Sequence, residues 1–390
     1  MVKRKVNNAH GCRNLAVKTR KKGEVDVPSG TVLVDVRKNN WRLGSAFARG
    51  GFGMLYKAAK SPSNQEQFVC KIEPKSNGPI FCEIHFYLRT NDQVKMTEFM
   101  HQHNLVHLGV PVMQGHGQNE DHRFLIMNKY GENMEKSSLL VDNILLLACQ
   151  LIYILEYIHS FGYTHNDVKA SNIVMDLNDK RKVYLIDFGL TNKFRSNTSD
   201  HIPMKIRPKC MHDGTIDYTS LDAHNGIQGS RRSDLEILFY NLIDWLSGGK
   251  LPWRPYIQNA DKIKQMKLDV KNNPDDMLSQ CLKNKLKPKA IIELKKFANH
   301  IYELGYDQCP NYELCRTHLL NIVQIDKIKF NGLLLSSVNS DTLCAVNTKS
   351  TTRGQENHFE MNSHCDIGNP IARVRKRNAR PFNRSIQTDE

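Results

Sequence analysis

The sequence of 390 residues is 40% hydrophobic and 24% charged, the balance of a soluble chain that can bury a core. This composition excludes collagen-like, wholly disordered and disulfide-scaffold proteins, and the length suits one large two-lobed domain with tails or two small domains. Lys and Arg number 55 against 40 Asp and Glu, and the net charge of +15 is typical of proteins that meet polyanions such as nucleic acid, ATP or acidic membranes.

Neither a disulfide framework nor a membrane span is expected. The ten cysteines are scattered without a Cys-x-x-Cys pair, and the closest two, Cys309 and Cys315, lack zinc-ligand spacing. Because the N-terminus is polar and basic, without a secretory signal, we expect reduced thiols in the cytosol or nucleus. The most apolar stretch, 144–158, is shorter than the ~20 residues of a membrane span, which predicts a buried helix and no membrane association.

Positive charge is concentrated at the two ends of the chain. Residues 1–40 contain ten Lys and Arg against three acids, and residues 371–384 contain six against none. Little hydrophobic periodicity accompanies these clusters, so we expect a flexible basic N-terminal arm over 1–40 and a polar tail over 331–390. Such a cluster can be simply solvated, can serve as an import signal or can contact DNA. The presence of two separate clusters favours nuclear import and DNA contact.

Between the ends, the pattern changes from β-rich to helical. From Trp41 to Tyr130 there are short β-like runs, and one helix is predicted to begin at Pro79, a favoured first helical position. Beyond Gly131 the chain is mostly helical, with one hairpin. A small β-rich half followed by a larger α-rich half predicts a cleft between them. The β-like runs are 54–58, 68–72 and 124–127, and the hairpin strands are 172–175 and 183–186.

Two features of the β-rich half suit phosphate binding. The glycines of 49–53 let the backbone approach a triphosphate and donate its N–H groups, although a glycine-rich hairpin turn explains them equally well. Lys71 ends an apolar run, and Glu83 follows twelve residues later on the inner face of the predicted helix. A Lys71–Glu83 pair would aim the ammonium group at phosphate oxygens, whereas the alternative is an ordinary surface charge pair.

The most informative stretch is 165–172, followed fifteen residues later by Asp187-Phe188-Gly189. Phosphoryl transfer needs a carboxylate to orient and deprotonate the attacking hydroxyl, which suits Asp167, and a cation such as Lys169 to neutralise the phosphoryl charge. Asn172 and Asp187 can hold Mg²⁺ across the phosphates. The whole set in this order, after the glycine-rich loop and Lys71, favours phosphoryl transfer over a series of turn residues and helix caps.

This set resembles a eukaryotic-type protein kinase and, more narrowly, the vaccinia-related kinases, a branch of the casein-kinase group. The resemblance runs from about Trp41 to Phe330. It implies an α+β, bilobal kinase fold over 41–330, with a small β-rich N-lobe (41–127), a hinge (128–130) and a larger, mainly helical C-lobe (131–330). The motifs are Lys71-Ile72-Glu73-Pro74, Asn77-Gly78-Pro79, Asp167-Val168-Lys169-Ala170-Ser171-Asn172-Ile173-Val174, Asp213-Gly214-Thr215, Asp222-Ala223-His224-Asn225-Gly226 and Ser230-Arg231-Arg232-Ser233-Asp234-Leu235-Glu236.

The resemblance also implies residue roles. Asp167 becomes the proton acceptor, with Lys169 as its catalytic partner, and Asp234 becomes a buried support for the catalytic loop. Asn172 and Asp187 become the Mg²⁺ ligands. The residues implied to contact ATP, including the phosphate-clamping pair, the gatekeeper Met127 and the adenine hinge, are Phe47, Ala48, Gly50, Gly51, Gly53, Leu55, Lys71, Glu83, Met127 and Tyr130.

Three positions depart from the usual kinase pattern. Ala48 stands where the first glycine of the loop is usual, and Asn166 stands before the catalytic Asp, where many kinases have Arg and this family usually has Gly. The usual Ala-Pro-Glu is absent, with Asp213-Gly214-Thr215 in the region that anchors the activation segment. Lys169, two residues after the base, resembles serine/threonine rather than tyrosine kinases.

The resemblance therefore implies an ATP- and Mg²⁺-dependent serine/threonine protein kinase. Nuclear members of the family phosphorylate chromatin proteins, including histones and barrier-to-autointegration factor. We expect such substrates, a nuclear location with a cytoplasmic pool left open, a monomer and no membrane anchor. One alternative is a kinase-fold chromatin scaffold with weak or no catalysis, which Ala48 alone favours. The other is a small-molecule phosphotransferase, which the Lys169 spacing and the long 187–222 segment disfavour.

Overall fold

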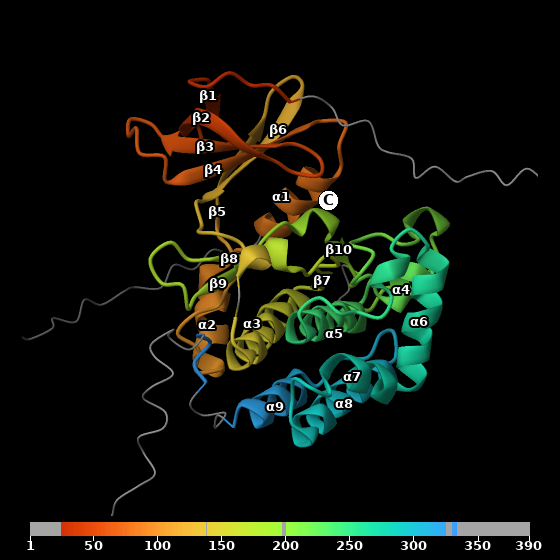
Figure 1. Cartoon of the computed structure of the whole chain (residues 1–390). Helices are drawn as coiled ribbons and strands as arrows, with labels where there is room; N and C mark the ends of the chain where they lie inside the picture. Colours follow the sequence, from red (N-terminus) through yellow and green to blue (C-terminus); the bar gives the residue numbers. More distant parts are fainter. Residues whose placement is uncertain (1–24, 138, 197–199, 325–329, 334–390) are drawn as a thin grey trace, which may run out of the picture. The chain divides into compact units, whose positions relative to one another are not determined.

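A six-stranded antiparallel sheet begins the described part of the chain (Figure 1). The computed structural model describes residues 25–137, 139–196, 200–324 and 330–333, which fall within one compact unit, Met1–Ser337. The strands lie in the order β1-β2-β3-β4-β6-β5. They are β1 (Val32–Val34), β2 (Asn40–Arg49), β3 (Met54–Lys60), β4 (Phe68–Pro74), β5 (Met113–Gln118) and β6 (His122–Asn128).

Strand alternation gives this sheet two different faces. On one face, Cys70 and Ile72 of β4 pack with Trp41 and other apolar side chains into a small core of their own. The residues between them point the other way, so Lys71 faces the helix that follows β4 rather than this core. The remaining members of the small core are Val25, Leu33, Leu43, Tyr56, Ala58, Phe124 and Ile126.

Part of the expected flexible N-terminal arm is folded, so that prediction is wrong for residues 25–40. Val25 is buried in the small core, and the backbone N–H of Val27 donates to the Tyr56 hydroxyl at 3.0 Å. Strand β1 pairs with β2. A three-residue strand is too short to give a periodic signal, and only Leu33 of β1 is buried while Val32 and Val34 are exposed. The basic residues of 1–24 lie outside the described part.

Helix α1 (Pro79–Thr90) begins at the predicted residue and packs beneath the sheet (Figure 1). Pro79 suits the first turn because the missing N–H has no intrahelical partner there. The buried face of α1 includes Glu83 among apolar side chains, which directs a carboxylate toward Lys71 on β4. Helix α2 (Gln93–Gln102) follows, and the Asp92 side chain caps its N-terminus by accepting from two backbone N–H groups.

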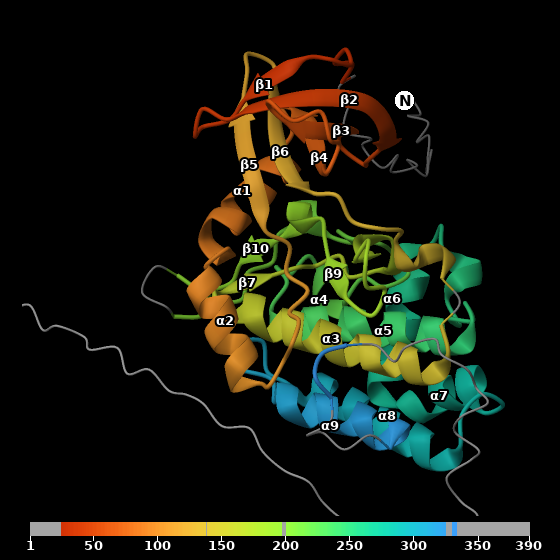
Figure 2. The same ribbon diagram turned by 90° about the vertical axis from the view of Figure 1, so that its left-hand side faces the viewer.

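The helical half follows β6. Helices α3 and α5 lie side by side below the sheet, with α8 and α9 packed beyond them (Figures 1 and 2). Strands β8 and β9 pair antiparallel, which confirms the predicted hairpin. The elements are η1 (Met134–Lys136), α3 (Val141–Ser160), β7 (Tyr163–Thr164), η2 (Ala170–Asn172), β8 (Ile173–Met175), β9 (Val183–Leu185), η3 (Phe188–Leu190), β10 (Asn192–Lys193), η4 (Pro208–Cys210), α4 (Leu221–His224), α5 (Arg231–Ser247), η5 (Arg254–Tyr256), α6 (Ala260–Asn272), α7 (Pro274–Leu282), α8 (Pro288–Glu303) and α9 (Tyr312–Val323).

Helix α3 is the centre of the larger core. At 20 residues it is longer than the expected 144–158, and by length and composition alone it could cross a membrane. However, 78% of its most apolar window is buried, against α5, α9 and the β8–β9 hairpin. A helix that is apolar on most of its circumference is typical of the centre of a large domain, and α3 occupies that position here.

Candidate active site

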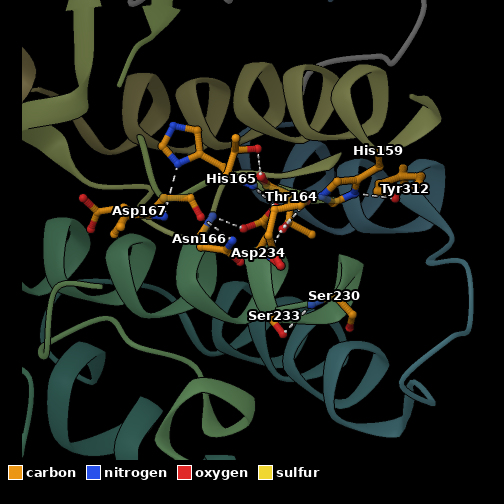
Figure 3. Close-up of polar contacts among 12 residues, drawn as sticks. His159, Thr164, His165, Asn166, Asp167, Ser230, Ser233, Asp234 and Tyr312 are labelled. Carbon is orange, nitrogen blue, oxygen red and sulfur yellow. Dashed lines mark hydrogen bonds and ion pairs between the residues drawn. The ribbon is translucent and has the colours of Figure 1, made fainter. Parts of the chain in front are cut away.

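The loop between β7 and β8 is held in place by one buried carboxylate (Figure 3). Asp234 of α5 accepts hydrogen bonds from the backbone N–H groups of His165 and Asn166, both at 2.7 Å. Its Oδ2 also lies 2.9 Å from Nε2 of His159 on α3, and Nδ1 of His159 lies 2.7 Å from the Tyr312 hydroxyl on α9. Three helices of the larger lobe thus fix the backbone just before Asp167.

Asn166 fits this loop for a conformational reason. Its φ of 69° lies in the left-handed region, which Asn tolerates better than most residues. The side chain faces inward, where Nδ2 donates to the Leu190 carbonyl at 2.8 Å. A Cβ placed at Gly229 would overlap Oδ1 of Asn166, so a larger residue there would force the Asn166 side chain to move. In this protein the residue before Asp167 joins the loop to η3 through a neutral amide.

Asp167 lies at the centre of a compact polar cluster and is 8% exposed. Its Oδ2 is 2.7 Å from Nζ of Lys169, and its Oδ1 accepts from the Thr215 hydroxyl at 2.7 Å. Lys169 also donates to that hydroxyl at 2.9 Å. The Asn172 amide donates to the Asp167 backbone carbonyl at 2.8 Å and to Oδ2 at 3.2 Å. The carboxylate therefore has one fixed orientation.

Thr215 is a site residue that sequence reasoning missed. The segment 213–215 was expected only to anchor the activation segment, whereas the Thr215 hydroxyl donates to Asp167 and accepts from Lys169. We predict that Thr215→Val lowers kcat by about tenfold to a hundredfold, the effect of losing a hydrogen bond to a charged group. Thr215→Ser, which keeps the hydroxyl, should retain most of the rate. Steady-state kinetics of both variants test this, and a valine variant as fast as the serine variant would contradict it.

Lys71 lies among three carboxylates. Its Nζ is 2.8 Å from Glu83 Oε2, 2.9 Å from Asp187 Oδ1 and 3.6 Å from Glu73 Oε1. Burial alone would lower the pKa of Lys71, but the three negative charges raise it well above its ordinary value. Phe188 extends the connection, because its backbone N–H donates to Glu83 at 3.2 Å. The predicted Lys71–Glu83 pair is thus present. Lys71 also contacts Asp187, the residue expected to hold Mg²⁺.

Glu73 was not expected in this cluster. It is fully buried, Oε2 accepts from the Ile80 backbone N–H at 3.1 Å, and Oε1 has no hydrogen-bond partner. Burial raises the pKa of Glu73, and burial likewise raises the pKa of Glu83 against the opposing pull of Lys71. The sequence could have indicated this position of Glu73, because Glu73 follows Lys71 by two residues on β4 and residues two apart on a strand share a face.

Asn172 immediately precedes β8 and Asp187 follows β9, so both lie at the open end of the hairpin, where the backbone N–H of Ile186 donates to the Asn172 carbonyl at 2.8 Å. Asp187 has a left-handed backbone and a side chain that is 45% exposed, and Lys71 lowers its pKa. An amide oxygen and an ionised carboxylate are ligands that Mg²⁺ prefers. The described residues contain no cluster of three or more metal-ligating His, Cys, Asp or Glu side chains. The remaining ligands would have to be phosphate oxygens and water.

The glycine-rich loop joins β2 to β3. The backbone N–H of Gly50 donates to the Gly53 carbonyl at 2.9 Å. A Cβ placed at Gly51 meets nothing within 4 Å, so packing within the protein does not explain this glycine. The open space beside Gly51 leaves room for a phosphate group to approach the backbone, which is the role expected of this loop. Asn77 supports the loop by donating to the Phe52 carbonyl at 2.8 Å.

The other residues expected at the nucleotide belong to the sheet or directly follow it. Ala48 and Leu55 are paired across β2 and β3, and Phe47 is an exposed side chain of β2. Met127 lies near the end of β6, and the Tyr130 ring packs 4.4 Å from that of Tyr184 on β9. Four of the five are sheet residues, and Tyr130 lies just after β6 in the expected hinge. The missing glycine at Ala48 leaves an ordinary strand residue in its place.

The segment before α5 is anchored by one ion pair and by a buried lysine that donates to backbone carbonyls. Arg232 binds Asp222 through two nitrogen atoms, at 2.7 and 2.9 Å, and this salt bridge lies within the protein. Lys267 of α6 is fully buried and donates to the carbonyls of Ile216 and Thr219 at 3.0 and 2.7 Å. Burial lowers the pKa of Lys267 to about 7. These contacts replace the absent Ala-Pro-Glu motif as the support of the segment that carries Thr215.

Comparisons with known proteins agree with this geometry. Residues 41–242 match the protein kinase domain. The chain is 37% identical over 320 residues to nucleosomal histone kinase 1 of Drosophila melanogaster, covering 78% of this chain but only about half (52%) of that relative. It is 36% identical over 304 residues to the B1 kinase of Monkeypox virus, covering 75% of this chain and 96% of the relative. The solved structure of vaccinia related kinase 3 matches with a TM-score of 0.68 and 26% identity, over 80% of this chain and 97% of that one, which confirms the predicted fold.

Proposed function

The chain belongs to the vaccinia-related family of serine/threonine protein kinases, and from this we propose that it transfers the γ-phosphoryl group of Mg·ATP to serine or threonine hydroxyls of nuclear, chromatin-associated proteins. The observation that carries the proposal is the position of Asp167, fixed by Lys169 and Thr215 beside the two oxygen ligands Asn172 and Asp187. A non-catalytic scaffold would have no need of this full set of groups.

In this mechanism Asp167 accepts the proton of the substrate hydroxyl as its oxygen attacks the γ-phosphoryl group, whose bond to the β-phosphate oxygen breaks and releases ADP. Thr215 holds one carboxylate oxygen and Lys169 the other, so the base is oriented before substrate arrives. Lys71 would bind phosphate oxygens while Glu83 keeps its ammonium group in place. Mg²⁺ held by Asn172 and Asp187 would neutralise charge on the phosphates.

The substrate class rests on the family and on charge. One relative is named for a nucleosomal histone substrate, and the chain carries a net charge of +15 with basic clusters toward both ends. The cluster 371–384 lies outside the described residues, so its place here comes from composition alone. We propose nuclear residence and contact of this cluster with DNA or nucleosomes, with histones and proteins like barrier-to-autointegration factor as substrates.

The test of this proposal uses radiolabelled ATP and Mg²⁺ with purified nucleosomes, free histones and barrier-to-autointegration factor as separate substrates. The intact chain should label at least one of them, and Asp167→Ala should not. Labelling of a generic protein substrate but of none of these three would overturn the chromatin part of the proposal while leaving the kinase part in place.

The basic cluster 371–384 should govern retention on chromatin and not catalysis. Neutralising phosphates gives DNA binding that falls with salt, with a log–log slope of about −0.9 per phosphate contacted. Replacing five cations by Ala should flatten that slope, whereas turnover of a short peptide should change little because the cleft residues are untouched. An unchanged slope would show that this cluster does not contact DNA. The five cations are Arg373, Arg375, Lys376, Arg377 and Arg380.

A further inference from the structure

Beside the segment that carries Thr215, a buried lysine and two histidines form a chain of hydrogen bonds. Nζ of Lys267 on α6 lies 3.3 Å from Nε2 of His224, and Nδ1 of His224 lies 2.8 Å from Nδ1 of His212. Helix α6 packs against α4, which ends at His224 (Figure 1). Lys267 and His224 are fully buried, whereas His212 is half-buried. The chain therefore leads from the core toward the surface.

The two ends of this chain hold the segment on either side of Thr215. Lys267 donates to the carbonyls of Ile216 and Thr219, which directly follow or lie close after Thr215. His212 lies three residues before Thr215, and its backbone N–H donates to a carbonyl of α4 at 2.9 Å. Because the Thr215 hydroxyl contacts the proposed base, a change at either end of the chain reaches the site of phosphoryl transfer.

Each contact of the chain needs one donor and one acceptor, which restricts where the protons lie. A charged Lys267 has three N–H donors, two for the carbonyls and one for Nε2 of His224. His224 then carries its own proton on Nδ1 and donates it to His212. If His212 is the charged group instead, it donates to Nδ1 of His224, and Nε2–H of His224 donates to a neutral Lys267. Both arrangements satisfy every contact with the same number of protons.

A second added proton cannot be accommodated. When Lys267 and His212 are both charged, each presents N–H donors to His224, whose neutral ring has only one acceptor nitrogen. One of the two contacts must therefore break. His212 is the half-buried member and can turn to water, whereas Lys267 has no exposed surface and keeps its two carbonyls.

The charges around the histidines oppose the second proton as well. Burial lowers the pKa of His212, and Lys264 and Lys267 of α6 lower it further against the opposing pull of Asp261. Burial and the adjacent Lys267 lower the pKa of His224 to about 2, so this ring stays neutral. A proton therefore enters the exposed end of the chain at His212 or not at all.

The surroundings of Lys267 favour its charged form. Glu236 of α5 and Asp217 oppose the lowering of the Lys267 pKa by burial. Burial raises the pKa of Glu236 itself to about 7. The ring centroids of Tyr240 and Trp253 lie 4.9 and 5.3 Å from Nζ, where the faces of aromatic rings attract a cation. The first proton thus belongs on Lys267, and His212 is the group that a further proton reaches.

We propose that His212, His224 and Lys267 are positioning residues that hold Thr215 against the proposed base while His212 is neutral and release one side of its segment when His212 gains a proton. This inference rests on the proposed function and adds a pH dependence to the same site. The contact of neutral His212 is present above the ordinary pKa of His and is lost as pH falls through the lowered pKa of the folded protein.

Replacing His212 by Asn separates the titration from the contact. Asn places its amide oxygen where Nδ1 lies, tolerates the left-handed φ of 63° and accepts from His224 without taking up a proton. From about pH 7.5 to about pH 5.5, kcat of the intact chain should fall about threefold to tenfold more than kcat of His212→Asn, the effect of one hydrogen bond. Titration of the base and of ATP is common to both and cancels. His101→Asn, an exposed histidine of α2, is the matched control and should follow the intact chain.

A second measurement needs no catalysis. NMR titration of the histidine rings, with the His212 signal identified by its absence in His212→Asn, should give a pKa for His212 below the ordinary value of His. Lys267→Met should raise this pKa, because the opposing charge and the competing donor are both removed.

Equal pH profiles of kcat for the intact chain and His212→Asn would overturn the proposal. A pKa of His212 at or above the ordinary value in the intact chain would overturn it too, and this result does not depend on whether Lys267→Met folds. Failure of the folded, intact chain to transfer phosphate at any pH would overturn the proposed function, and the NMR titration alone would then decide whether the three side chains are linked through their protons.

Discussion

Replacing Lys71 by Met is expected to destabilise the nucleotide-free protein strongly at neutral pH and much less in mild acid. Lys71 is the cation shared by Glu73, Glu83 and Asp187, and its side chain is only 16% exposed. Removing one partner of a buried ion pair costs about 3–5 kcal/mol, because the remaining charges are left buried without compensation. In a domain of this size that corresponds to a fall in Tm of about 10 °C.

The pH dependence follows from the carboxylates that stay behind. Burial already raises the pKa of Glu73 and of Glu83, and Lys71 opposes that rise, so its loss raises both values further. An acid whose pKa is higher in the folded state than in the unfolded state favours folding at low pH, and this contribution is lost as pH rises through the folded value. Lys71 also lowers the pKa of Asp187. This shift stabilises the folded protein at pH values above the ordinary pKa of Asp, and the variant loses that contribution.

The gap in Tm between the intact protein and Lys71→Met should therefore widen from about pH 5 to about pH 8. Thermal denaturation at both pH values measures it. Adding Glu73→Gln to the variant should recover part of the loss at the higher pH, because one uncompensated carboxylate is removed. A gap of equal size at both pH values would mean that charge in this cluster is not the cause.

Replacing Asp167 by Asn should lower the rate of phosphoryl transfer by about 10²–10⁴-fold, the range for a positioned acid–base group. Asn keeps the shape of Asp167 and can still contact Thr215 and Lys169, so the fold should be preserved. The affinity for ATP should be close to that of the intact chain, since Asp167 makes no contact with Lys71 or the glycine-rich loop. The affected quantity is kcat.

Calorimetric titration with ATP and steady-state kinetics with a protein substrate separate these two effects. Lys71→Met is the useful contrast, because it should weaken ATP binding as well as turnover. If Asp167→Asn transferred phosphate as fast as the intact chain, the assignment of the base would be wrong. If instead it lost ATP affinity to the same degree as Lys71→Met, the carboxylate would act in binding rather than in proton transfer.

Sequence patterns predicted the parts of the site that are close together along the chain. The Pro79 start places Glu83 on the inner face of α1, and alternation on β4 turns Lys71 toward it. The antiparallel hairpin brings the start of β8 beside the end of β9, so Asn172 and Asp187 become neighbours. In each case, secondary structure and one short connection determine the geometry.

The parts that sequence reasoning missed depend on distant segments. Thr215 is 48 residues from Asp167, and Lys267 reaches the carbonyl of Thr219 from a helix that follows 48 residues later. No sequence periodicity links such distant positions. Taken alone, each of these residues looks like an ordinary surface or turn residue. Buried carboxylate oxygens without a hydrogen-bond partner, such as Oδ1 of Asp217 and of Asp244, can be found only when partners are counted in three dimensions.

The most direct measurement is phosphoamino acid analysis of a protein substrate after incubation with γ-labelled ATP and Mg²⁺, using the intact chain and Asp167→Asn in parallel. The expected result is label on serine or threonine with the intact chain, and a loss of about 10²–10⁴-fold with the variant under the same conditions. The absence of label with a folded, ATP-binding intact chain, or equal labelling by Asp167→Asn, would contradict the proposal that Asp167 and its neighbours form a phosphoryl-transfer site.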